Sequence, residues 1–125
     1  MYTILLIEDN AQTARMVQKV LETADMTVHY APNGMTGLGL AQEYAFDLIL
    51  LDIHLPDLDG KVVAANLRGN VAPIIAFSAD DSPRSRKMAA AFGCHNFIAK
   101  PINTRLFPTQ ITEMIAHHRE AGEHA

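Results

Sequence analysis

The chain has 125 residues, of which 49% are hydrophobic and 19% are charged, and its formal net charge is −4 at pH 7. This length and balance suit one globular domain, residues 1–125, and exclude a disordered chain. The net charge and the lack of a basic stripe argue against direct binding to nucleic acid, because phosphate contacts need clustered Lys and Arg side chains.

Short apolar runs alternate with longer segments of helical periodicity. The first run, Tyr2–Glu8, predicts a strand buried on both faces. Asn10 can cap a helix that extends to about Thr23, and Thr27–Ala31 predicts a second strand. A second helix is expected over Met35–Tyr44. The apolar positions of the first helix recur at intervals of three and four residues: Ala14, Val17, Val20, Leu21 and Ala24.

The middle of the chain predicts a third strand that ends on an acid. Within Phe46–Gly60, the aliphatic run Leu48–Leu51 is followed directly by Asp52. A continuous aliphatic run indicates burial on both faces of a sheet, so Asp52 is expected where the strand leaves the core. A short helix is then expected over Gly60–Arg68, and Pro73–Ala79 predicts the fourth strand.

The last third of the chain predicts a helix, a strand and a final helix. Ser82 followed by Pro83 is a favourable helix start, and Gly93 suits the left-handed position after a helix end. Asn96–Ala99 predicts the fifth strand. The last helix is expected to begin near Phe107, because a proline follows that position. Four of its apolar side chains are expected to point inward: Leu106, Ile111, Met114 and Ile115.

Five strands that alternate with five helices predict a doubly wound α/β domain, in which helices cover both faces of a parallel sheet. Ligands of such sheets bind outside the carboxyl ends of the strands. The residues at these ends therefore carry the functional information. They are Glu8 and Asp9 after the first strand, Asp52 after the third, Ser78 after the fourth and Lys100 after the fifth.

The chemistry of these residues indicates phosphoryl transfer. Two carboxylates about 4 Å apart repel each other by roughly 4 kcal/mol at an effective dielectric constant of about 20. A hard divalent cation such as Mg²⁺ offsets this repulsion and prefers carboxylate oxygens as ligands. Lys100 adds a positive charge and Ser78 adds a hydroxyl donor, and both suit an incoming phosphoryl group. The set fits the formation of an aspartyl phosphate.

Four motifs connect these residues to a known family. They are LLIEDN at the first acidic pair, LILLDIHLPDLDG at Asp52, AFSA at Ser78 and IAKPI at Lys100. In this order and spacing, the sequence resembles the receiver domain of two-component response regulators over essentially its full length. The resemblance implies a flavodoxin-like fold with five parallel strands in the order 2-1-3-4-5.

The resemblance also implies a role for most of the strand-end residues. Asp52 would accept the phosphoryl group. Asp9, Asp52 and the backbone carbonyl of His54 would bind Mg²⁺, or Mn²⁺, directly. Glu8 would act mainly through bound water, and Lys100 would neutralise the phosphoryl charge.

Further positions complete the implied site. Ser78 would hydrogen-bond a phosphoryl oxygen, helped by the backbone N–H groups of Ile53 and Ala79. Phe97 stands where the family often has a switch tyrosine, so the switch would act through packing alone. The Lys100–Pro101 peptide bond is expected to be cis.

The implied function is a signalling switch that catalyses its own phosphorylation and slow dephosphorylation. A sensor histidine kinase or a histidine phosphotransfer protein would supply the phosphoryl group. An unidentified downstream protein would bind the face formed by the fourth helix, the fifth strand and the fifth helix. Because the chain ends soon after the fifth helix, no effector domain is expected. The alternative is a receiver-like binding module that works without phosphorylation; a dehalogenase-type phosphatase is disfavoured, because His54 stands where that family needs a second acid.

Other conspicuous residues have simpler interpretations. Asp57 and Asp59 are interpreted as turn formers, and the glycines of GMTGLG, residues 34–39, as helix packing. The imidazole of His54 is expected at the mouth of the site, where we hypothesise that it alters the lifetime of the phosphoryl group. Three basic residues give the fourth helix an outer face that is solvated or binds a partner: Arg84, Arg86 and Lys87. Three histidines are assigned to a solvated C-terminal tail: His117, His118 and His124.

The sequence also predicts a cellular compartment. No apolar run approaches the roughly 20 residues needed to span a bilayer, and Met1 leads directly into a strand without a basic leader. The single cysteine, Cys94, cannot form an internal disulfide and is interpreted as a small, half-buried residue. We therefore expect a cytoplasmic protein that does not bind membranes.

Overall fold

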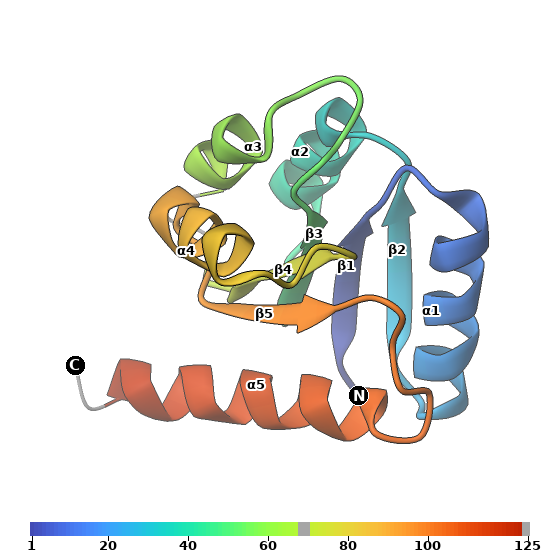
Figure 1. The fold of residues 1–125 in the computed structure, drawn as a ribbon. Helices are drawn as coiled ribbons and strands as arrows, with labels where there is room; N and C mark the ends of the chain where they lie inside the picture. The colour runs from blue at the N-terminus through green and yellow to red at the C-terminus, as the bar shows by residue number, and fades with distance from the viewer. Residues whose placement is uncertain (68–70, 124–125) are drawn as a thin grey trace.

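The computed structural model describes residues 1–67 and 71–123, in which five strands alternate with five helices. The strands form one parallel sheet in the order β2-β1-β3-β4-β5 (Figure 1), so the predicted fold and strand order are confirmed. Among the described helices, none has both the length and the apolar character of a membrane span. The elements are β1 (Thr3–Ile7), α1 (Ala11–Thr23), β2 (Thr27–Ala31), α2 (Gly34–Glu43), β3 (Leu48–Asp52), α3 (Gly60–Asn66), β4 (Ile74–Ser78), α4 (Pro83–Phe92), β5 (Asn96–Ala99) and α5 (Phe107–Glu123).

Helices cover both faces of the sheet. α1 and α5 pack on one face, and α2, α3 and α4 pack on the other (Figure 1). Ile4 and Leu6 of β1 belong to the layer with α1 and α5, whereas Leu5 of the same strand belongs to the opposite layer. Successive side chains of a strand point to opposite faces, which is why this strand is apolar throughout. In the first layer, the rings of Phe77 and Phe107 stack with centroids 6.3 Å apart and place the start of α5 in the core.

Capping residues begin and end the helices where the sequence indicates. The side chain of Asn10 accepts a hydrogen bond from the backbone N–H three residues later, at 2.9 Å, and begins α1. Ser82 caps α4 in the same way, at 3.2 Å. Gly93 follows α4 with a φ angle of 104°, in the left-handed region. The predicted end of α3 at Arg68 lies outside the described residues, and the helix extends through Asn66.

Two apolar residues do not lie where the sequence predicts. The inward position of Leu106 was wrong: the residue is 56% exposed, because it lies in the turn before α5 and its N–H donates to the carbonyl of Asn103 at 3.1 Å. Phe107, the first residue of the helix, is buried instead. Ala24 is exposed because α1 ends at Thr23. The other three predicted inward positions of α5 are buried or half-buried: Ile111, Met114 and Ile115.

Glycine allows α2 to approach β1 and α3 closely. A Cβ atom at Gly37 would lie 2.5 Å from Cδ1 of Ile7, and one at Gly34 would lie 3.0 Å from Cγ2 of Val63. At Gly39, by contrast, no described atom outside the neighbouring turns of α2 lies within 4 Å of the position a Cβ would take. The packing interpretation of the glycines is therefore confirmed for the first two and not for the third.

Two of the C-terminal histidines lie on a helix and not in a tail. His117 and His118 belong to α5, which continues to Glu123, so the tail prediction was wrong for both, although His117 is exposed to solvent as expected; His124 lies outside the described residues. His118 is half-buried, and its ring centroid lies 4.9 Å from that of His95.

His95 connects the start of β5 to β4. Its N–H donates to the carbonyl of Ile74 at 2.7 Å, and its Nδ1 accepts the N–H of Ile74 at 3.0 Å. Burial lowers the pKa of His95, and the nearby His118 acts in the same direction. Protonation of Nδ1 would also remove its capacity to accept the Ile74 hydrogen bond.

The lowered pKa of His95 predicts a pH-dependent stability. Because the unfolded chain takes up this proton more readily than the folded chain, stability is expected to fall as the pH decreases below about 6.5, the ordinary pKa of histidine. Thermal unfolding at about pH 7.5 and about pH 5.5 measures the effect. His95→Asn keeps an acceptor near Nδ1 but does not titrate, so its melting temperature should fall less than that of the wild type. His117→Asn is the control, and equal decreases in all three proteins would contradict the prediction.

Candidate functional site

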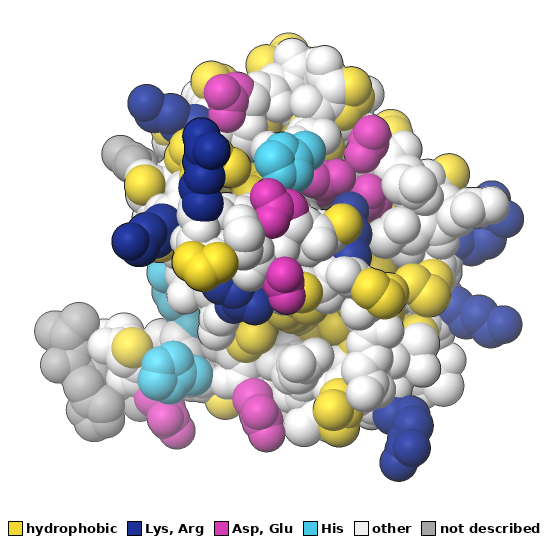
Figure 2. All heavy atoms as spheres, in the orientation of Figure 1, with side chains coloured by type: hydrophobic (Ala, Val, Ile, Leu, Met, Phe, Trp, Pro, Cys, Tyr) yellow, Lys and Arg dark blue, Asp and Glu magenta, His cyan; other side chains and the backbone are white. Residues whose placement is uncertain are grey.

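The carboxyl ends of β1 and β3 bring three acids together. Glu8 and Asp9 follow β1, and Asp52 is the last residue of the neighbouring strand β3. One carboxylate oxygen of each residue lies within 4.8 Å of the others. Glu8 is fully buried and Asp52 is nearly so, whereas Asp9 is exposed. Figure 2 shows acidic side chains gathered over this end of the sheet, so the convergence predicted from the sequence is observed.

Lys100, directly after β5, supplies a positive charge to the acidic cluster. Its Nζ lies 2.7 Å from Oε2 of Glu8 and 3.4 Å from Oδ2 of Asp52. The backbone N–H of Lys100 donates to the carbonyl of Ser78 at 2.8 Å, which connects the ends of β4 and β5. The peptide bond to Pro101 is cis. Residues at the carboxyl ends of four strands, β1, β3, β4 and β5, therefore meet at one end of the sheet.

Among the three acids, Glu8 has a pKa that its surroundings shift. Burial raises the pKa of Glu8, the hydrogen bond from Lys100 opposes this change, and the charge of Asp52 raises the pKa further. The N–H of Asn10 donates to Oε1 of Glu8 at 3.1 Å and lowers the pKa slightly. The net direction is upward, so Lys100 does not offset the burial and the neighbouring charge that disfavour the ionised form of Glu8. An additional cation would stabilise the charged forms of the carboxylates.

The donor set fits a hard divalent cation. Carboxylate oxygens at this spacing are the ligands that Mg²⁺ and Mn²⁺ prefer in proteins. Oδ1 of Asp52 accepts the N–H of His54 at 2.8 Å, so the loop after β3 bends around the carboxylate. The side chain of His54 is exposed. The cluster therefore meets the solvent at Asp9 and beside His54, whereas Glu8 and Asp52 are buried.

Ser78 and two backbone groups border the same edge. Ser78 is the last residue of β4, is 1% exposed and accepts the N–H of Asp80 on its Oγ at 3.1 Å. Ile53 and Ala79 directly follow Asp52 and Ser78, respectively. Within the described residues, no hydrogen bond joins the side chains of Ser78 and Asp52. The hydroxyl thus belongs to the site by position, but its present partner is the backbone.

Asp57 has a role that the sequence does not reveal. Its Oδ1 accepts the N–H of Gly34 at 2.9 Å, and its Oδ2 accepts the N–H of Met35 at 3.0 Å. Both bonds lower the pKa of Asp57, and they connect the loop after β3 to the first turn of α2. No local signal marks a pairing across 23 residues. Asp59 acts as expected in a local turn, where it caps α3 and accepts the N–H of Lys61 at 2.9 Å.

Phe97 is half-buried on β5 beside α4. It packs against Ile53 and Ala89, and Cζ of Arg86 lies 4.6 Å from the centroid of its ring. Nε of Arg86 also donates to the carbonyl of Asp81 at 3.2 Å. The basic face of α4 is therefore not uniformly solvated, because one of its arginines has intramolecular partners.

Comparisons with known proteins agree with this geometry. Residues 4–112 match the model of the family described as the response regulator receiver domain. The transcriptional regulatory protein PcoR of Escherichia coli is 32% identical over 121 residues, which cover 95% of this chain and 50% of that protein. The chain spans about half the length of the curated relatives that head the comparison.

Solved structures show the same fold. A receiver domain from Methanospirillum hungatei JF-1 has a TM-score of 0.87 at 23% identity, with 97% of this chain and 98% of that chain covered. The receiver domain of a sensor histidine kinase from Pseudomonas aeruginosa PAO1 has a TM-score of 0.84 at 27% identity, with 92% and 98% covered, and holds a magnesium ion in its active-site cleft. Together with the match over residues 4–112, these findings show that the chain belongs to the family of response regulator receiver domains of two-component signalling.

Proposed function

We propose that this receiver accepts a phosphoryl group on Asp52 from the phosphohistidine of a sensor histidine kinase or a histidine phosphotransfer protein. The observation that supports this most directly is the cluster of Glu8, Asp9 and Asp52 within 4.8 Å, with Nζ of Lys100 at 2.7 Å from Glu8. A carboxylate oxygen of Asp52 attacks phosphorus as the bond from phosphorus to the donor imidazole nitrogen breaks. The imidazole leaves with the bonding electrons and takes up a proton from solvent.

Mg²⁺, or Mn²⁺, is the cofactor that fits these residues. Asp9, Asp52 and the backbone carbonyl of His54 would bind it directly, and the buried carboxylate of Glu8 would hold it mainly through water. The ion supplies positive charge that neutralises the phosphoryl oxygens. The relative from Pseudomonas aeruginosa, which holds magnesium in its cleft, supports this assignment.

The remaining site residues would respond to the new charge. A phosphoryl group adds roughly 1.5 to 2 negative charges, and Lys100 lies close enough to Asp52 to pair with it. The hydroxyl of Ser78, which accepts the N–H of Asp80, would donate its proton to a phosphoryl oxygen, assisted by the backbone N–H groups of Ile53 and Ala79. Repacking would then extend to Phe97 and change the surface formed by α4, β5 and α5, which a downstream protein reads.

Incubation with Mg²⁺ and acetyl phosphate tests the proposal. The wild type is expected to gain one phosphoryl group by mass spectrometry, and Asp52→Asn none, because an amide is not a nucleophile of this kind. Asp57→Asn is the matched control, since this carboxylate faces α2 and should leave phosphorylation in place. No added mass on the wild type would favour the alternative, a receiver-like module that binds partners without phosphorylation.

His54 is proposed to alter the lifetime of the phosphoryl group. Its side chain is exposed beside the site, near Asp80, whose N–H donates to Ser78. The N–H of Ser82 is the main cause that lowers the pKa of the Asp80 carboxyl, and a positive charge on His54 would act in the same direction. His54→Ala is expected to change the half-life of phosphorylated Asp52 several-fold, measured by the loss of phosphoryl mass after removal of the donor. An unchanged half-life would remove this role.

A cytoplasmic location is part of the proposal. Cys94 is half-buried, and burial raises the pKa of its thiol to about 11. A thiol with this pKa stays protonated and unreactive at neutral pH, in keeping with a packing role. The expectation that the receiver itself contacts no nucleic acid rests on the net charge of −4.

A further inference from the structure

β2 is an edge strand whose outer side is available for pairing. The N–H of Thr27 donates to Tyr2 at 2.9 Å, and the carbonyl of Ala31 accepts the N–H of Glu8 at 3.0 Å. Alternate residues of a strand direct their backbone groups to the same side. The N–H and carbonyl groups of Val28 and Tyr30 therefore point away from β1.

This edge lacks the devices that commonly protect edge strands. Its sequence, TVHYA, contains no proline, lysine or acidic residue, and its backbone shows no positive φ angle. The side chains of Val28, His29 and Tyr30 are half-buried, so part of each is exposed to solvent. An extended peptide that pairs with this edge would cover the exposed parts of these side chains.

Aromatic rings border the edge on both faces of the sheet. On the side of α2, the ring centroid of His29 lies 5.0 Å from that of Tyr44 and 5.3 Å from that of Phe46. Tyr44 is 49% exposed, so one ring of this group is open to a ligand. On the side of α1, Tyr30 packs against the core layer next to Val28. Side chains of an added strand would meet a ring on either face.

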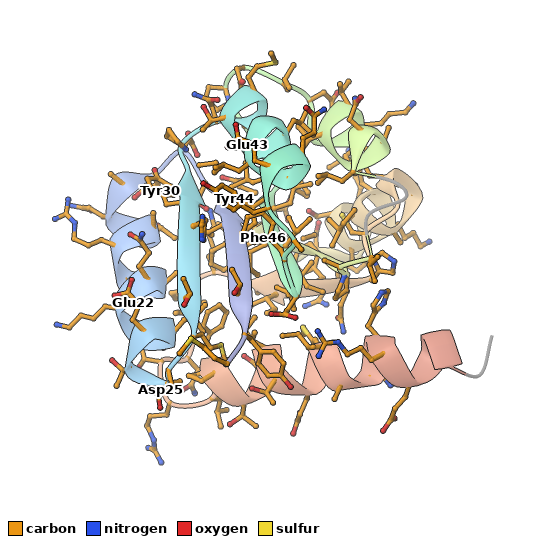
Figure 3. All side chains as sticks on the ribbon, turned by 180° about the vertical axis from the view of Figure 1, so that it is seen from behind. Glu22, Asp25, Tyr30, Glu43, Tyr44 and Phe46 are labelled. Carbon is orange, nitrogen blue, oxygen red and sulfur yellow. The ribbon has the colours of Figure 1, made fainter. Side chains whose placement is uncertain are left out.

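Acidic side chains lie at several points around the edge. Figure 3 views the molecule from the side of β2 and shows Glu22 on α1, Asp25 in the turn before β2 and Glu43 at the end of α2 around this strand. All three are exposed. Arg15 and Lys19 line the same surface hollow as Glu22, and among the described residues no ion pair joins Asp25 or Glu43 to a basic side chain. Near the carboxyl end of β2, burial is the main cause that raises the pKa of Tyr30, and the negative charges of Glu8 and Asp9 raise it further.

We propose that the β2 edge binds an extended segment of a partner protein that carries basic side chains at alternate positions and adds as a sixth strand. Backbone hydrogen bonds to Val28 and Tyr30 give the pairing, and a Lys or Arg side chain lies over the exposed ring of Tyr44. A second copy of this chain is disfavoured as the occupant, because edge-to-edge pairing would bring the same acids together. The site needs no phosphoryl group and is separate from the α4-β5-α5 surface.

A pair of synthetic peptides tests this assignment. Peptides of alternating valine and lysine, or alternating valine and glutamate, are titrated into the ¹⁵N-labelled protein, and amide resonances are followed by NMR. The lysine peptide is expected to shift the amides of Val28 and Tyr30 in a saturable manner that added salt weakens, and the glutamate peptide is expected not to bind. No shift at these amides, shifts centred on another surface, or equal binding of both peptides would each overturn the proposal.

Two substitutions separate backbone pairing from charge. Val28→Pro removes an outward N–H at an edge position, where proline is tolerated, and is expected to weaken binding about fivefold. Glu43→Lys is expected to weaken it about threefold. Glu113→Lys, on α5, is the charge control and should leave affinity unchanged. If Val28→Pro does not fold, the affinities of Glu43→Lys and Glu113→Lys for the lysine peptide are compared instead. Equal affinities of these two variants would contradict the assignment. A dimer of the wild type in sedimentation that Val28→Pro abolishes would contradict it as well.

Discussion

Lys100→Met is expected to slow the phosphorylation of Asp52 by about 10²- to 10³-fold, the effect typical of removing one preorganised group that stabilises charge in an active site. Nζ of Lys100 lies 3.4 Å from Oδ2 of Asp52, so it is placed to stabilise charge that develops during transfer. Methionine retains an unbranched chain but carries no charge. The measurement is the initial rate of phosphoryl incorporation from acetyl phosphate at saturating Mg²⁺.

The control for this variant must separate chemistry from folding. Lys100 also lies 2.7 Å from the fully buried Glu8, so its removal leaves that carboxylate without its ion-pair partner and should lower the melting temperature. The double variant Lys100→Met, Glu8→Gln removes the unpaired charge and should recover part of the stability. Lys87→Met changes an exposed lysine of α4 and should react at the wild-type rate. A folded Lys100→Met protein that reacts within about tenfold of the wild type would contradict the role of Lys100.

Gly60→Ala is expected to lower the free energy of unfolding by about 1–3 kcal/mol, as overpacking does in a rigid environment. A Cβ atom at this position would lie 2.7 Å from the carbonyl oxygen of Ile53 and 3.0 Å from its Cα. These are backbone atoms of the residue that follows Asp52, so the contact cannot be relieved by a change of rotamer. The displaced segment carries the N–H proposed to bind the phosphoryl group, and phosphorylation should slow as well.

Gly39→Ala is the matched control for Gly60→Ala. Gly39 lies inside α2, and no described atom outside the neighbouring turns of this helix lies within 4 Å of a Cβ position, so alanine should stabilise the helix by about 0.5–1 kcal/mol. Chemical denaturation of both variants measures the difference. Equal stabilities for Gly60→Ala and the wild type would show that the loop after β3 yields more readily than the close contact implies.

The sequence predicts the fold and the acidic cluster for the same physical reason. β3 has a run of aliphatic residues that ends abruptly on Asp52, and such a run indicates both a buried strand and the point where it reaches the sheet edge. Parallel strands place their carboxyl ends on one side, so the convergence of Glu8 and Asp9 with Asp52 follows from topology. Strand limits differ from the predictions by about one residue at some ends, where local pattern has little discriminating power.

The remaining features depend on contacts between distant segments. The hydrogen bonds from Gly34 and Met35 to Asp57 and the packing of His118 against His95 join residues whose local sequences carry no mark of a partner. Leu106 shows a related limit: apolar character predicts burial, but this residue lies in the turn before α5, and Phe107 takes the buried position instead. Periodicity therefore identifies elements well and their long-range partners poorly.

The two hydrogen bonds of Asp57 connect α2 directly to the loop after β3. The two oxygens of the Asp57 carboxylate accept the N–H groups of Gly34 and Met35 separately. A displacement of this loop would therefore move the first turn of the helix. α2 lies on the same face of the sheet as α4 but belongs to a different part of the surface (Figure 1). A structural change in the loop that follows Asp52 would therefore also displace α2, which lies on the side of the sheet toward β2 and away from β5.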